Sequence, residues 1–203
     1  MAKSKKNYMY TFDHDLFLWL NFDGGPVMDS IMTAVSGVVM WIPLYAFIIY
    51  FAYRNFGWQR ALGFVVCLVL ALGFSDILCG IFKHSGPLKD LWESFPVRHR
   101  PMFEGAVSKY THVVSYDHGF YGTVSAHAAT VVALAWMSAL MIRKNWYKWV
   151  ISAAVILICY SRIYLACHFP MDLLIGALVG TVVGLLIYLL WRKFDKVIAK
   201  QRK

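Results

Sequence analysis

Long apolar stretches dominate the pattern of hydrophobic and polar positions along this chain. Five of them, over residues 31–53, 61–82, 120–142, 149–167 and 173–191, run for 19 to 23 residues with at most one Asp, Glu, Lys or Arg each. A bilayer core about 30 Å thick needs roughly 20 apolar residues of helix, so each stretch predicts a membrane-spanning helix. A shorter stretch, residues 15–21, precedes Gly24, Gly25 and Pro26, which predicts a helix at the membrane interface or a sixth, short span.

The sequence therefore predicts an all-α integral membrane protein with five to six transmembrane helices in a bundle. We expect residues 1–203 to form a single membrane-embedded domain. Its parts are an N-terminal interfacial segment (1–27), a polar outward-facing loop (83–119) and a basic cytoplasmic tail (192–203). The composition agrees, because 60% of the residues are hydrophobic and only 15% are charged. An ordinary soluble domain, in which about a quarter of residues are charged, is thereby excluded.

The positive charge of the chain points to a bilayer. The formal net charge is +9, which in a soluble protein would suggest a nucleic-acid partner. Here 11 of the 20 basic residues fall within 54–60, 143–148 and 192–203, which share one side of a five-span bundle. The positive-inside tendency assigns that side to the cytoplasm. We therefore expect no nucleic-acid partner, and a loop 83–119 that faces the periplasmic side of a bacterial inner membrane.

A stripe of small residues marks the last predicted span. Gly176, Gly180 and Gly184 are four residues apart, which predicts close packing against another helix. The partner helix can belong to the same bundle or to a second copy, so the oligomeric state stays open.

The sharpest polar pattern is Ser161-Arg162, then His168 and Asp172. His168 and Asp172 are four residues apart, which would place them on one face of a helix, although Pro170 between them also fits a turn entering one. A carboxylate beside an imidazole fixes its tautomer and makes the other ring nitrogen a directed nucleophile or base. The alternative is a structural His–Asp pair that caps the helix, and the spacing alone fits both.

Two further patterns add positive charge and proton donors. Residues 121–127 (YGTVSAH) combine hydroxyls, a helix N-terminus and His127, which suits anion binding and proton transfer. Arg98 and Arg100 flank His99, and two arginines can grip an oxyanion bidentately. All of these residues fall on the outward side of the bundle. Together they predict a phosphate site with a nucleophile and an acid.

These motifs resemble those of the type 2 phosphatidic acid phosphatase family of membrane lipid phosphatases. The family pattern Ser-Arg, five residues, His, three residues, Asp is complete here, and Pro-Ser-Gly-His is present in altered form as Val124-Ser125-Ala126-His127. The first family motif, Lys, six residues, Arg-Pro, is partial: Arg100-Pro101 is present, but Glu93 stands where the lysine is expected. Lys83 resembles the missing lysine, with an insertion before Arg100, and Lys89 is its rival.

The resemblance implies a role for each site residue. His168 would attack phosphorus to form a phosphohistidine, Asp172 would orient it, and His127 would protonate the leaving oxygen. The remaining members would hold the phosphate oxygens: Arg162, Arg100, Lys83 or Lys89, Ser125 and the N–H of Ala126. The resemblance implies no metal and no other cofactor.

The expected substrate is a lipid phosphate presented at the outer boundary of the membrane. We expect undecaprenyl diphosphate first, lipid A second and phosphatidylglycerol phosphate third. The alternative from another class is a transporter, which would more often place charges near mid-span and contain repeated or broken helices.

Overall fold

Helices form nearly all the regular structure of this protein, whose computed structural model describes residues 2–82, 98–116 and 118–201. Within these residues an isolated antiparallel bridge joins His99 to Tyr121. Short 3-10 turns are η1 (Val39–Trp41), η2 (Pro101–Phe103) and η3 (Ser108–Tyr110). The α-helices are α1 (Ala2–Leu20), α2 (Gly25–Ser36), α3 (Ile42–Phe56), α4 (Trp58–Ile81), α6 (Ala126–Ile142), α7 (Asn145–Tyr164) and α8 (Pro170–Gln201).

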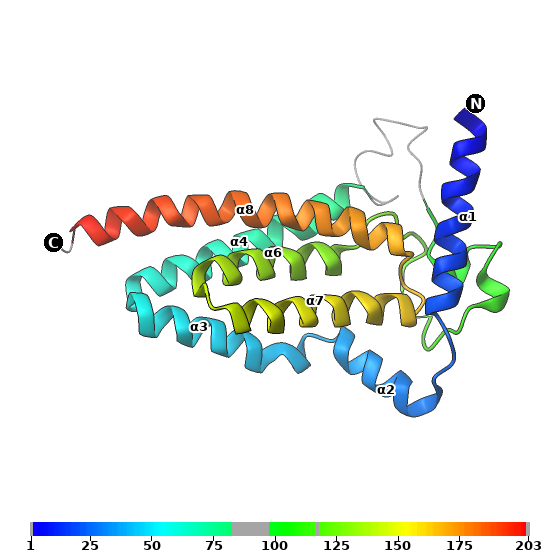
Figure 1. Cartoon of the computed structure of the whole chain (residues 1–203), viewed down its shortest axis with the longest axis horizontal. Helices are drawn as coiled ribbons and strands as arrows, with labels where there is room; N and C mark the ends of the chain where they lie inside the picture. Colours follow the sequence, from blue (N-terminus) through cyan, green and yellow to red (C-terminus); the bar gives the residue numbers. More distant parts are fainter. Residues whose placement is uncertain (1, 83–97, 117, 202–203) are drawn as a thin grey trace.

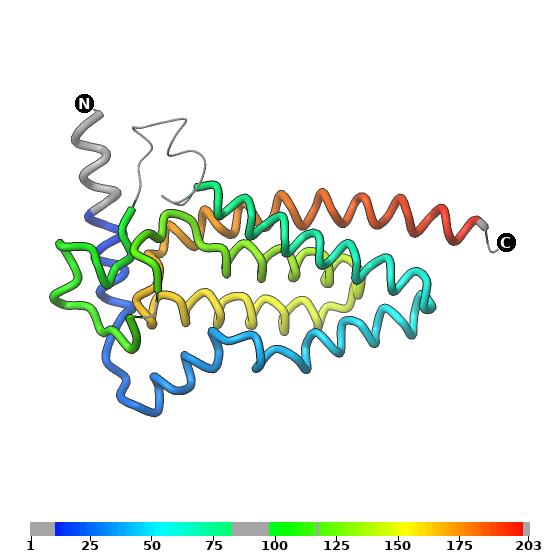
Figure 2. The backbone as a smooth tube through the Cα atoms, turned by 180° about the vertical axis from the view of Figure 1, so that it is seen from behind, coloured from blue at the N-terminus to red at the C-terminus, as the bar shows by residue number. Residues whose placement is uncertain are grey.

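The long helices run side by side, and the shorter N-terminal elements gather at one end of the bundle (Figure 1). Helix α6 lies centrally and packs against α4, α7 and α8. Helix α1 crosses the end of the bundle at which α8 begins, and the segment after residue 98 lies at the same end (Figure 2). The carboxyl end of α8 lies at the opposite end, where it extends beyond the turn between α3 and α4.

The apolar helices make this an integral membrane protein. Among the described residues, α4, α7 and α8 are each long and apolar enough to cross a bilayer, and α2 with η1 and α3 qualifies as a bent pair. Helix α6, with 17 residues, is shorter. Large apolar side chains such as Val69, Leu178 and Leu186 are more than half exposed on the helix surfaces, as expected for contact with lipid. The count of five to six spans stays a prediction.

The span expected over residues 31–53 is not one continuous helix. It is bent by 66° between α2 and the η1–α3 segment. The backbone of Gly37 becomes extended (φ −81°, ψ 151°) after Ser36, and Pro43 lies at the start of α3. A proline at this position lacks the N–H that a continuing helix would use, so the chain starts a new helix there. The uniform apolar character of the stretch concealed this break.

Other boundaries also differ from the sequence prediction, three of them most clearly. Helix α1 covers 19 residues rather than the short stretch 15–21, and α8 continues through most of the expected tail to Gln201. Helix α6 begins at Ala126, six residues after the start of the expected span. Its start is set by Ser125, whose hydroxyl oxygen accepts a hydrogen bond from the N–H of Ala128 (3.3 Å) and so caps the helix.

The glycine stripe of α8 packs against the backbone of α6. A Cβ atom added at Gly176 would lie 2.3 Å from the carbonyl oxygen of Ser125, and one at Gly180 would lie 2.1 Å from that of Ala129. At Gly184 the nearest atom would be the Cα of Ala133, at 2.9 Å. The stripe is thus used for packing within the bundle, where it holds α6 and α8 close together from the points at which both helices begin.

We expect Gly180→Ala to destabilise the protein, because its methyl group would force α6 and α8 apart. Overpacking of this kind typically costs about 1–3 kcal/mol, which corresponds to several degrees in the melting temperature of the detergent-solubilised protein. Gly73→Ala in α4 is the matched control, since a Cβ there meets no heavy atom within 4 Å. Equal melting temperatures for the two variants would contradict the close contact.

Candidate active site

A tight turn between α7 and α8 brings the third sequence motif together. Arg162 lies in the last turn of α7, and its carbonyl oxygen accepts a hydrogen bond from the N–H of His168 (3.3 Å). Ala166 adopts the left-handed conformation (φ 54°) that reverses the chain. Pro170 then starts α8, and Asp172 lies in its first turn. The predicted spacing therefore corresponds to one compact turn that carries three buried polar side chains.

His168 is held by a backbone carbonyl as well as by a carboxylate. Its Nδ1 lies 3.1 Å from the carbonyl oxygen of Gly122 and 3.7 Å from Oδ2 of Asp172. A carbonyl oxygen can only accept, so Nδ1 carries the proton in this contact. Nε2 then bears a lone pair, which is the state that a nucleophilic histidine requires. Gly122 itself must lack a side chain, because a Cβ there would lie 2.9 Å from Cγ of Arg100.

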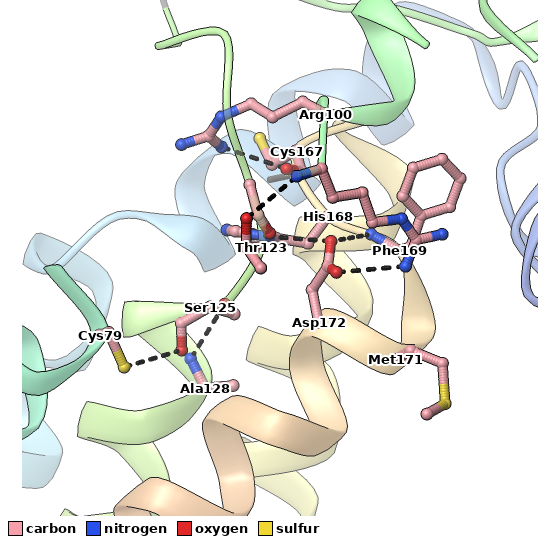
Figure 3. A network of polar contacts seen from close by, with 12 residues as sticks. Cys79, Arg100, Thr123, Ser125, Ala128, Cys167, His168, Phe169, Met171 and Asp172 are labelled. Atoms are coloured by element: carbon pink, nitrogen blue, oxygen red, sulfur yellow. Dashed lines mark hydrogen bonds and ion pairs between the residues drawn. The ribbon is translucent and has the colours of Figure 1, made fainter. Parts of the chain in front are cut away.

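Asp172 is almost fully buried and is held from two sides. Its Oδ2 accepts a hydrogen bond from the N–H of Phe169 (3.0 Å), and its Oδ1 pairs with Nη1 of Arg98 (3.2 Å). Figure 3 shows the carboxylate between the start of α8 and the side chain of His168. The expected His–Asp pair is therefore present, with Asp172 as part of a larger charged group.

The two loop arginines have different surroundings. Arg98 and Arg100 were expected to grip an oxyanion together, but the Arg98 guanidinium faces carboxylates, pairing with Asp13 of α1 (2.6 Å) as well as with Asp172. Arg100 instead donates from Nη1 to the carbonyl oxygen of Cys167 (3.1 Å) (Figure 3). The expectation for Arg98 is wrong in this structure, because two acidic side chains that no sequence motif links to it compete for its charge.

Arg100 and Arg162 retain unused hydrogen-bonding capacity. In the part of the chain that the structure describes, Nε of each is buried and has no hydrogen-bond partner. Arg162 donates from Nη1 to the hydroxyl of Ser36 at the end of α2. Burial lowers the pKa of Arg100, but a guanidinium stays protonated in proteins. Buried donors are normally paired, so two unpaired guanidinium N–H groups fit an anion with several acceptor oxygens.

The start of α6 adds further donors. By helix geometry the first N–H groups of α6, at Ala126 and His127, have no partner within the helix, and they favour anions. The N–H of Ser125 donates to the carbonyl oxygen of Asp172 (3.1 Å), which ties this terminus to α8. The Ser125 hydroxyl is fully buried in its capping bond with Ala128. A direct contact between this hydroxyl and phosphate stays a prediction.

His127 lies where the site meets an apolar groove of about 490 Å³. Arg162, His168 and Arg100 are all within electrostatic range of its ring. The lining of the groove includes the polar side chains of His127, Ser36, Asp76 and Thr130. The other lining side chains are mostly apolar and come largely from α3, α4, α6 and α7, among them Tyr45, Ile49, Val65, Leu68, Val69, Leu134 and Ile158. A molecule with a polar head and an apolar chain would match this division.

Some site residues are not tested, and others were missed. Lys83 and Lys89 lie outside the described residues, so the identity of the first-motif lysine stays a prediction. Sequence reasoning missed Gly122, Asp13 and Ser36. A weak signal existed for Asp13, which with His14 and Asp15 forms a polar group directly before the apolar residues 16–20.

Comparison with known proteins decides the family. A family model described as the PAP2 superfamily matches residues 64–196, which is more than half of the chain. The chain belongs to this superfamily. The resemblance found in the sequence is thereby confirmed, and this PAP2 protein is a membrane enzyme that hydrolyses lipid phosphates. The matched range includes the start of α6, the α7–α8 turn and Arg100.

Individual relatives carry three different substrate names. A lipid A 4'-phosphatase of Bacteroides thetaiotaomicron is 33% identical over 188 residues, covering 92% of this chain and 80% of the relative. An undecaprenyl-diphosphatase of Sulfolobus acidocaldarius is 24% identical over 181 residues, with 86% and 76% covered. The crystal structure of a PAP2-type phosphatidylglycerolphosphate phosphatase from Bacillus subtilis covers 95% of this chain and 88% of its own, with a TM-score of 0.62 and 20% identity. That structure has the same fold.

Proposed function

We propose that this PAP2 enzyme removes a phosphate group from lipid A through a phosphohistidine on His168. The observation that carries the proposal is a pair of buried guanidinium N–H groups, those of Arg100 and Arg162, which have no hydrogen-bond partner among the described residues. They lie beside a histidine whose Nδ1 is held by the carbonyl oxygen of Gly122. Fixed positive charge around a nucleophile is what phosphoryl transfer requires of a protein.

The proposed reaction uses two histidines in turn. Nε2 of His168 attacks phosphorus, and the bond between phosphorus and the lipid oxygen breaks. Protonated His127 gives its proton to that leaving oxygen. Water then attacks the phosphohistidine, with His127 taking a proton from it, and inorganic phosphate leaves. Throughout, Arg100 and Arg162 neutralise the phosphate oxygens, which carry the greatest negative charge in the transition state.

The apolar groove supports a lipid substrate over a soluble phosphate. It is lined by His127 and by apolar side chains of helices whose outer surfaces face the bilayer. An acyl chain could occupy it while the phosphate remains among the arginines. Apolar side chains at membrane depth give a soluble sugar phosphate no hydrogen bonds, so the groove favours substrates that bring their own apolar surface.

The choice of lipid A rests on sequence similarity over nearly the whole chain. The lipid A 4'-phosphatase relative shares 33% of residues, against 24% for the undecaprenyl-diphosphatase relative. This favours lipid A over undecaprenyl diphosphate, which the sequence alone placed first and which remains the second candidate. The asymmetry of basic residues supports an inner-membrane location with the site on the periplasmic side.

The test is phosphate release by the detergent-purified protein from four lipids: lipid A, undecaprenyl diphosphate, phosphatidylglycerol phosphate and phosphatidic acid. We expect lipid A to be the preferred substrate and mass spectrometry to detect a product lacking one phosphate. His168→Ala measures the background. Preference for another lipid in the panel would overturn the choice of substrate, and no release from any lipid would overturn the proposed function as a whole.

Filling the groove should weaken lipid binding selectively. We expect Val65→Trp, in the groove wall, to raise the KM for the lipid substrate about tenfold relative to that for p-nitrophenyl phosphate. Val66→Trp is the matched control, because Val66 is half-exposed on the neighbouring face of α4 and does not line the groove. Equal effects of the two variants would mean that the lipid chain lies elsewhere.

A further inference from the structure

A three-member charged group connects α1 to the active site. Arg98 bridges two buried carboxylates: its Nη2 lies 2.6 Å from Oδ2 of Asp13, and its Nη1 lies 3.2 Å from Oδ1 of Asp172. The side chains of Asp13 and Asp172 are 3% and 2% exposed, and that of Arg98 is 16% exposed. Ion pairs shielded from water in this way interact far more strongly than pairs on a protein surface.

Arg98 and Asp13 are each fixed by a second contact. The Arg98 guanidinium lies 3.7 Å from the ring centre of Phe169, in cation–π geometry, and its backbone N–H donates to the Thr123 hydroxyl (3.2 Å). Asp13 also accepts from the N–H of Met171 (3.0 Å) in the first turn of α8. An acidic group at a helix N-terminus is favourable, so Asp13 binds both the arginine and the helix that carries Asp172.

With both carboxylates ionised, the charges of the group add to a net −1 beside His168, whose Nδ1 is 3.7 Å from Asp172. His14 of α1 adds none near neutral pH, because burial and the Arg98 charge lower its pKa. Among the described residues, the titratable or charged groups near this end of the bundle also include Arg100, Glu104, His118, His127, Arg162, Cys167, Asp15 and His99. Without Asp13, the charges of Arg98 and Asp172 would cancel, so it is Asp13 that gives the group facing the imidazole its net negative charge.

We propose that Asp13 and Arg98 are positioning residues that set the orientation and net charge of the group facing the nucleophile. The proposal rests on the proposed role of His168. It gives α1, which contributes no residue to the sequence motifs, a defined part in the reaction. Arg98 acts through Asp172, and Asp13 acts through Arg98.

The sign of the effect follows from the charge. A nucleophilic His168 must be neutral, and nearby negative charge stabilises its protonated form. Asp13→Asn raises the net charge of the group from −1 to zero, so neutral His168 should persist to lower pH. The ascending limb of kcat/KM against pH should therefore move to lower pH, by about half a unit to one unit. Removing Arg98 leaves a net −2 and should move the limb to higher pH.

The experiment uses p-nitrophenyl phosphate, which engages the phosphate site without a lipid chain. Three variants of the full-length protein are compared with wild type in detergent: Asp13→Asn, Arg98→Gln and the double variant. The double variant restores the net −1 of Asp172 alone, so its limb should return close to that of wild type even if kcat stays low. The ionisation of the substrate is the same for all, so differences between variants report the enzyme.

A purely structural role predicts a different result. Destabilised protein would lose kcat at every pH without moving the limb, and the double variant would be the most damaged. An unmoved limb in Asp13→Asn, or movement in the same direction in both single variants, would overturn the proposal. If Asp13→Asn does not purify in folded form, the predicted opposite shift in Arg98→Gln decides. Retained turnover in His168→Ala would instead show that the nucleophile is misassigned, which is a separate failure.

Discussion

Replacement of His168 by alanine is expected to reduce phosphate release by at least about 10⁴-fold, because the variant has no group to accept the phosphoryl unit. The fold should survive, since the Arg162 carbonyl and Gly122 belong to elements that are held by other contacts. The first measurement is turnover of the preferred lipid. The second uses the same lipid with a radiolabelled phosphate group and denatures the enzyme without acid, so that a labelled phosphoenzyme is preserved and detected. Wild type should yield an acid-labile, base-stable phosphohistidine.

His99→Ala is the matched control for this experiment. Its ring lies in the same segment as Arg98 but is 45% exposed and stacks on Tyr121. We expect the variant to keep most of its activity and its phosphoenzyme. A phosphoenzyme trapped in His168→Ala would move the nucleophile to another residue and would remove the basis for the reaction proposed above.

Replacement of His127 by alanine should lower lipid turnover by about 10² to 10⁴-fold, the usual contribution of a general acid. The loss should depend on the leaving group. A sugar or lipid alcohol needs a proton as its bond to phosphorus breaks, whereas p-nitrophenolate leaves readily without one. Kinetics with the lipid and with p-nitrophenyl phosphate should therefore show a much larger loss for the lipid.

Thr130→Val provides the control for His127. Thr130 lies one turn further along α6, lines the same groove and donates its hydroxyl to the carbonyl oxygen of Ala126. Its replacement changes the groove wall without removing a group that titrates near neutral pH. We therefore expect little change in the ratio of the rate with the lipid to the rate with p-nitrophenyl phosphate. Equal losses on both substrates in His127→Ala would assign His127 a role in binding rather than in proton transfer.

The sequence predicts the parts of this fold that depend on neighbouring residues, such as the position of an apolar helix. Residues 173–191, and residues 61–82 apart from Ser75 and Asp76, are largely apolar, and both stretches correspond to helices. The stretch 31–53 is equally apolar, yet it is bent at Gly37, because apolar character reports burial in lipid and carries little information on backbone direction. The pairing of Gly37 with Pro43, six residues later, was the available signal for the break.

The candidate site divides in the same way. His168 and Asp172 are near neighbours in sequence, so their spacing already indicated the pair. The contacts of Arg98 depend on Asp13, 85 positions earlier in the chain, and one sequence offers no means of pairing residues so far apart. The free N–H groups at the site are those of the first turn of α6, so their position depends on where that helix begins. The capping hydroxyl of Ser125 marks this start in the sequence.

The carbonyl of Gly122 has a consequence for how this enzyme can be dissected genetically. A main-chain acceptor is present whichever amino acid is encoded, so an alanine scan through residues 121–125 would leave it in place and would credit the orientation of His168 to Asp172 alone. Gly122→Ala would mislead in the other direction, because its methyl group would press on Cγ of Arg100. Converting the amide between Gly122 and Thr123 to an ester weakens the acceptor without adding an atom to either side chain. Such a backbone substitution, rather than a side-chain mutation, can measure how much the Gly122 carbonyl and the Asp172 carboxylate each contribute to orienting His168.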